Sequence, residues 1–145
     1  MANLFPRRYS QARLSRPTPA FTIIPPMYST QLLDHFQNPR NVGELADADA
    51  TASLENPACG DILLLSLKVS GGRITHALFK AKGCVATLAC GSALTELLVG
   101  KTLQEARTLR RADLDSAVGG LPHASTHAAQ LSLDALSQAL NRIRS

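Results

Sequence analysis

The chain has 145 residues, of which 45% are hydrophobic and 4% aromatic, with a formal net charge of +4. This length and content predict one domain that can bury a core without disulfide bonds, and three cysteines are too few for a disulfide scaffold. With few aromatics, no basic stripe and no apolar run of membrane-spanning length, we expect a soluble, cytoplasmic protein that binds neither nucleic acid nor membrane.

Residues 1–26 hold the whole net charge. Of the 15 Lys and Arg residues, four are arginines in this segment, which has no acid, so the remaining 11 balance the 11 acidic residues of 27–145. Its prolines predict a disordered basic extension, followed by one domain over 27–145. An acid-free leader with Arg and Ser also resembles a mitochondrial transit peptide. Because prolines disfavour an amphipathic helix, we prefer an extension upstream of a natural start at Met27.

From Met27 onward, the pattern predicts a helix, a small sheet and then more helices. Ser29 caps a helix that ends before Asn38-Pro39. Strands are expected over 51–55, 62–69 and 73–81, and further helices over 84–99, 102–107, 112–118 and from about 125 to the C-terminus. The predicted fold class is therefore α+β, with an antiparallel sheet of about three strands packed against helices.

The turn between the second and third strands predicts a register. Gly71-Gly72 suits the positive φ angles of a type I′ hairpin, in which paired residue numbers add to a constant. Without a bulge, Leu64 faces Phe79, His76 faces Leu67, and Leu78 shares the core face of the second strand.

The same register places Cys59 directly opposite Cys84, with Cα atoms roughly 4.5–5.5 Å apart. Asp61 lies on the same face as Cys59, and Cys84 begins a helix, where free N–H groups favour a thiolate. Two facing thiols beside an aspartate predict a metal or iron–sulfur site, rather than two buried apolar thiols. A disulfide fits this geometry as well, but a reducing compartment disfavours it.

The other candidate ligands are weaker. Cys90 lies six residues further along the same helix and points some 240° around its axis from Cys84, so we assign it to the core. Of the four histidines, only His123 and His127 are placed to reach the open end of the hairpin. His127, at a helix start, is the better candidate ligand.

Residues 27–145 resemble the iron–sulfur cluster assembly scaffolds of the IscU and NifU N-terminal family. The resemblance rests on stretches in family order and near-family spacing: Asp34–Gly43 (DHFQNPRNVG), Pro57–Asp61 (PACGD), Lys82–Cys84 (KGC), Leu97–Leu103 (LLVGKTL), Leu121-Pro122 and His127. It implies a non-enzymatic scaffold for a labile [2Fe–2S] cluster, with a cysteine desulfurase and recipient apo-proteins as partners.

Carried over position by position, the resemblance makes Cys59 and Cys84 the first two cluster ligands. Asp61 matches the aspartate that tunes cluster release, and His127 the histidine beside a third cysteine. That third cysteine is replaced by Ala128, which cannot carry a persulfide or bind iron. The family's chaperone-recognition stretch Leu-Pro-Pro-Val-Lys is here residues 121–125, LPHAS, and the lost lysine argues against docking to the specialised Hsp70 system.

Cys59, Asp61, Cys84 and His127 therefore form the predicted ligand set. Two thiolates, an imidazole and a carboxylate suit one Zn²⁺ or Fe²⁺ ion, or a [2Fe–2S] cluster with mixed ligands. Two other functions stay open: a zinc-bound sulfur acceptor for a desulfurase, whose relatives carry an extra segment missing here, and a degenerate regulator that binds the desulfurase without a cluster. Homodimerisation as a source of further ligands also stays open.

Overall fold

The computed structural model describes residues 28–143, so the predicted extension 1–26 lies outside the described residues. The described part of the chain begins with helix α2, continues through three strands, and then has four further helices and one short 3₁₀ segment. Their bounds are α2 Thr30–Gln37, β1 Ala50–Asn56, β2 Asp61–Ser70, β3 Arg73–Lys82, α3 Val85–Leu98, α4 Leu103–Arg107, α5 Arg111–Ala117, η1 His123–Ser125 and α6 Thr126–Asn141. The predicted α+β class, with three antiparallel strands, is confirmed.

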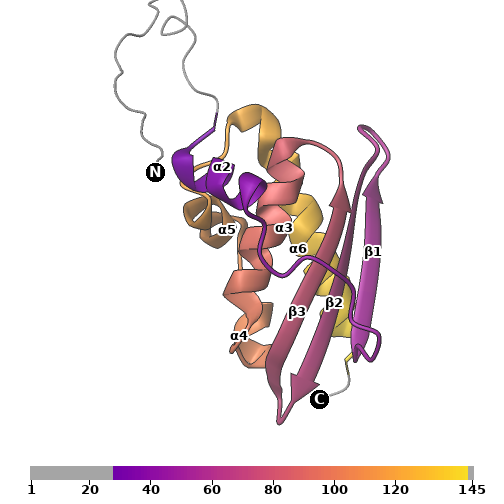
Figure 1. Ribbon diagram of the computed structural model, residues 1–145. Coiled ribbons are helices and arrows are strands. Elements are labelled where there is room, and N and C mark those ends of the chain that lie inside the picture. The colour runs from indigo at the N-terminus through magenta and orange to yellow at the C-terminus, as the bar shows by residue number, and fades with distance from the viewer. Residues whose placement is uncertain (1–27, 144–145) are drawn as a thin grey trace, which may run out of the picture.

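The sheet has the order β1-β2-β3, and the helices pack on one of its faces (Figure 1). Helix α3 lies against β3, α6 against β1 and β2, and α2 packs on α3. The buried face of β2 presents Leu63, Leu65 and Leu67, all fully buried. This alternation is what a strand with one face on a core requires, and it fixes which side of the sheet the helices cover. None of the helices in residues 28–143 is long and apolar enough to cross a membrane.

The predicted register of the β2–β3 hairpin is wrong over most of its length. Val69 pairs with Ile74 as expected, but Lys68 pairs with His76, because Thr75 is an extra residue in β3. This bulge moves every later pair by one position, so Phe79 lies opposite Leu65.

The bulge exchanges the two faces of β3. Phe79, predicted to face Leu64 on the outer face, is 1% exposed and packs in the core. Leu78, predicted to face the core, is half-buried on the other face, where Gly43 approaches it. The segment that leads from α2 to β1 runs along β3 here, and the backbone of Asn41 and Gly43 hydrogen-bonds to that of Phe79.

Candidate metal centre

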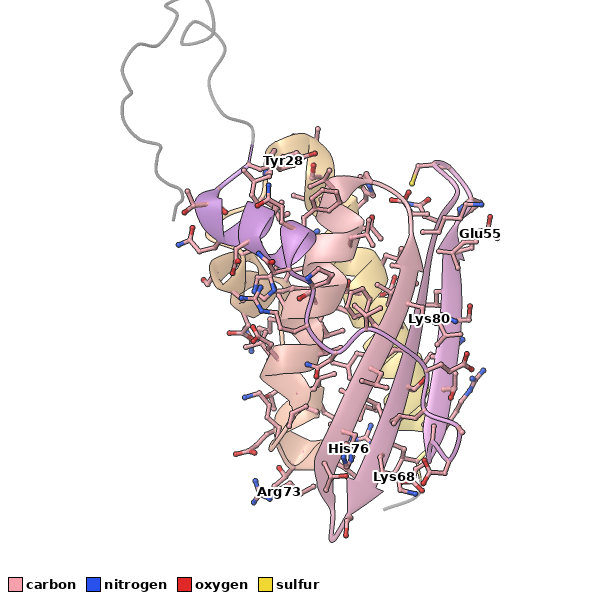
Figure 2. All side chains as sticks on the ribbon, in the orientation of Figure 1. Tyr28, Glu55, Lys68, Arg73, His76 and Lys80 are labelled. Atoms are coloured by element: carbon pink, nitrogen blue, oxygen red, sulfur yellow. The ribbon has the colours of Figure 1, made fainter. Side chains whose placement is uncertain are left out.

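The predicted ligands meet at one end of the sheet, where three chain segments converge. A four-residue turn, Pro57–Gly60, joins β1 to β2, β3 leads into α3, and η1 leads into α6. Figure 2 places Glu55, in β1, near this end and His76 at the opposite end, so His76 is remote from the site.

The sequence predicted that Cys59 pairs with Cys84 across a hairpin, and this prediction is wrong. Cys59 lies in the β1–β2 turn, where its own N–H group and that of Gly60 both donate to the carbonyl of Asn56. Gly60 has φ +76°, a left-handed conformation that glycine adopts without strain. The last residue of β1, Asn56, pairs directly with Asp61. The turn is therefore tight, and it presents an exposed Cys59 two residues from the buried Asp61.

The structure nevertheless brings the four predicted residues together. Sγ of Cys59, a carboxylate oxygen of Asp61 and a ring nitrogen of His127 all lie within 4.8 Å of one another. Sγ of Cys84 lies 3.7 Å from Oδ2 of Asp61 and 3.9 Å from Nε2 of His127. That same Oδ2 is 3.4 Å from Nε2 of His127. The carboxylate of Asp61 is thus the atom group that the other three share.

Asp61 is fixed by two residues that sequence reasoning missed. The hydroxyl of Thr87, fully buried in the first turn of α3, donates to Oδ2 of Asp61 at 2.7 Å and lies 3.3 Å from Sγ of Cys84. Gly83 leaves room for the carboxylate, since a Cβ at this position would lie 2.4 Å from its Oδ1. The position of Thr87, three residues after the helix start at Cys84, was a signal that could have been used, because side chains there point back to the helix cap.

The environment keeps Asp61 ionised. Burial favours the neutral acid and opposes this, but hydrogen bonds from Thr87, Cys59 and Cys84, with the nearby His127, together lower the pKa of the Asp61 carboxyl. An ionised carboxylate beside two thiols and an imidazole is a ready-made set of metal ligands.

Cys90 and Ala128 belong to the core. Both side chains are fully buried. Burial raises the pKa of the Cys90 thiol to about 12. The exclusion of Cys90 from the site agrees with its position. Ala128 follows His127 directly but packs in the hydrophobic core. At this point of α6 the donor side chain is therefore His127.

The remaining histidines have other surroundings. His35 is buried against α3, with Nδ1 2.8 Å from Oγ of Ser92 and Nε2 3.5 Å from Glu96. Burial lowers the pKa of its imidazole, which suits a structural role. His123 is exposed on η1. All three cysteines are free thiols, so the disulfide alternative does not describe this structure.

Comparison with known proteins identifies the family. The sequence-family model described as "NifU-like N terminal domain" matches residues 27–145. The chain belongs to this family.

Individual relatives agree with this assignment. An Archaeoglobus fulgidus protein named iron-sulfur cluster assembly scaffold protein IscU 1 is 44% identical over 114 residues, covering 79% of this chain and 74% of the relative. The Azotobacter vinelandii IscU scaffold protein is 38% identical over 117 residues, covering 78% and 91%. The crystal structure of a NifU-like N-terminal protein from Brucella abortus matches with a TM-score of 0.67 at 24% identity, over 81% of this chain and 94% of that one, and supports the fold.

Proposed function

We propose that this chain is a scaffold on which an iron–sulfur cluster is assembled and from which it is passed on. The observation that carries the proposal is the convergence of Cys59, Asp61, Cys84 and His127 at one end of a NifU-type fold. The matched relatives named as IscU scaffold proteins support the same function. The chain then acts without catalysing a reaction of its own, and its partners are a cysteine desulfurase and recipient apo-proteins.

The donor set suits a [2Fe–2S] cluster as the cargo. Cys59 and Cys84 supply thiolates, and His127 and Asp61 the two remaining donors, since mixed thiolate and nitrogen ligation of [2Fe–2S] centres occurs in proteins. Cys59 is exposed, so a cluster bound here stays accessible to a recipient. Because the pKa of Asp61 is lowered, its carboxyl group is already ionised. It can therefore bind or release the metal without first losing a proton.

A second candidate is a zinc-bound sulfur acceptor. Three donor atoms within 4.8 Å of one another also fit a single tetrahedral ion with a fourth ligand beside them. Against it, only 43 residues separate Cys84 from His127, without the additional segment expected of such relatives. The third candidate, a desulfurase-binding regulator, requires neither metal nor sulfide.

Anaerobic purification followed by iron, zinc and sulfide analysis separates these candidates. The scaffold proposal predicts iron and sulfide in equal amounts after reconstitution, with [2Fe–2S] absorption. His127→Ala should abolish the chromophore or shorten its lifetime, whereas His123→Ala, which changes an exposed histidine outside the donor group, should leave it intact. Tight zinc binding with no cluster would replace the scaffold by the zinc-bound acceptor, and the lack of both would favour the regulator.

A further inference from the structure

The face of the sheet opposite the helices is crossed by the segment that joins α2 to β1, residues 38–49 (Figure 1). Two contacts fix its course. Val42 forms a bridge with Phe79 of β3, and the ammonium group of Lys68 in β2 donates to the carbonyl of Asp47. The segment therefore divides this face into two halves. In the half next to the donor group, the outward-facing residues of β1 and β3 are exposed.

A cavity of about 270 Å³ lies in this open half. Ile62 and Leu64 of β2 line it and are only half-buried, so apolar surface here stays in contact with water. Lys80 and Lys82 of β3 line one side of the cavity. Exposed apolar side chains that are bordered by charged ones are typical of surfaces that bind other proteins.

The charges of the open half follow an order across the three strands. Ile62 pairs with Glu55 of β1 on one side and with Lys82 of β3 on the other, so these three side chains form one row on the same face. Glu55 and Lys82 are two strand spacings apart, roughly 9–10 Å, and neither forms an ion pair with another described residue. Glu55 and Lys80, which lies in the next row, can be located in Figure 2. The row thus runs from an acid through an apolar residue to a base, with both charges unpaired.

A row of this kind is complementary to a second copy of itself. A two-fold axis that runs along β2, between two copies packed face to face, places β1 of each copy over β3 of the other. Glu55 of one copy then meets Lys82 of its partner, and the symmetry repeats this contact. Ile62 and Leu64 of the two copies meet at the centre. Sheets packed in this way lie about 10 Å apart with their strands aligned to within about 30°, a gap that opposed glutamate and lysine side chains can span.

We propose that the open half of the sheet binds a second copy of this chain, in a dimer with its two-fold axis along β2. The contact is confined between residues 38–49 and the end of the sheet. We therefore expect an interface smaller than the roughly 1,200 Å² of a standard complex, and a dimer that dissociates on dilution. Asp61 is buried on the helix-covered face, on the same side of β2 as Leu63, so both donor groups face away from the contact. The inference goes beyond the proposed function and does not depend on a metal.

Sedimentation equilibrium of the full, metal-free chain tests the proposal. A reducing agent is present throughout, because Cys59 is an exposed thiol that could otherwise link two copies. Between about 5 and 500 µM we expect the average mass to rise from that of a monomer toward that of a dimer. Added NaCl should weaken the association, because the paired charges lie near solvent. Loading with Zn²⁺ should leave it unchanged.

Charge reversal assigns the contact. Lys82→Glu and Glu55→Lys should each weaken self-association about tenfold, because each replaces two attractive contacts of the dimer by two repulsive ones. An equimolar mixture of the two variants should recover the wild-type affinity, since every contact between the two different chains again joins opposite charges. Arg110→Glu, the same charge reversal at an exposed residue between α4 and α5, should have no effect. Equal melting temperatures verify that the variants fold.

Three results would overturn the proposal. A wild-type chain that stays monomeric over the whole range would show that no second copy binds, and would leave the open face to a different protein. A dimer whose affinity is unchanged by both charge reversals, or is not recovered in their mixture, would have its contact elsewhere. A dimer that forms only with Zn²⁺ would be joined through the donor groups. None of these results bears on whether the donor group assembles a cluster, so this inference and the proposed function fail separately.

Discussion

Replacing Thr87 by valine tests how the carboxylate at the centre of the site is held. Valine keeps the shape of threonine but removes the hydroxyl that donates to Oδ2 of Asp61 at 2.7 Å. Thr87 is fully buried and Asp61 is 5% exposed, so water cannot replace the lost donor without rearrangement. Loss of a hydrogen bond to a buried charged group typically costs about 1.5–3 kcal/mol. We expect a loss of this size in the free energy of unfolding of the metal-free protein at pH 7.

The pH dependence gives the sign of the effect. Because the pKa of Asp61 is lowered in the folded protein, ionised Asp61 contributes stability above its unfolded pKa, and this contribution is lost as the pH falls through the folded pKa. Thr87→Val raises the folded pKa and reduces that contribution. Wild type and variant should therefore differ most near neutral pH and converge in acid.

Urea unfolding at pH 7 and at pH 3, combined with an NMR titration of the Asp61 carboxyl, measures both effects. Thr87→Ser is the matched control, because it keeps the hydroxyl and should retain the lowered pKa even if its missing methyl group costs some stability. A double-mutant cycle with Asp61→Asn isolates the interaction energy. If Thr87→Val leaves the pKa of Asp61 unchanged, or if the cycle shows no coupling, the hydroxyl does not hold the carboxylate and the reasoning is refuted.

Three further outcomes are expected. Gly83→Ala should weaken Zn²⁺ binding measured by competition with a chromogenic chelator, because its Cβ would lie 2.4 Å from Oδ1 of Asp61; unchanged affinity would show that the carboxylate can move freely. Brief iodoacetamide treatment of the metal-free protein at pH 8, followed by mass spectrometry, should find Cys90 unmodified while the two site thiols react. The reason is that Cys90 is fully buried and its pKa is raised to about 12. Alkylation of Cys90 at the rate of the site thiols would contradict its placement in the core. Deletion of residues 1–26 should leave the melting temperature and metal content unchanged, and loss of folding would place that segment in the domain.

The sequence predicted the elements better than their register. Every strand and helix of the described chain lies within a few residues of its expected bounds, because the alternating and helical patterns and the caps are local signals. The bulge at Thr75 is not a local signal. It depends on how β3 packs against α3 and against the segment around Gly43, and a shift of one residue exchanges the faces of a strand.

The convergence of the site was predicted correctly, but in part for the wrong reason. Cys59 and Cys84 were expected to face each other across a hairpin, and the structure instead places Cys59 in the β1–β2 turn. The sequence from Asn56 to Gly60, with its Asn, Pro and Gly residues, contained the signal for that turn. Asp61 pairs with Asn56 at the start of β2. It therefore lies close to Cys59 in the observed turn, as it does in the predicted hairpin.

The site is built so that one donor is held rigidly and another is accessible. Asp61 lies in a strand, is buried and receives the hydroxyl of Thr87, so its position is set by the fold before any metal arrives. Cys59 lies on an exposed turn and is held there by its own backbone. A cargo bound between them has one ligand pre-organised by the core and one that a recipient's thiol can reach and replace. This division of roles suits a scaffold better than a permanent structural site, whose ligands are closed off.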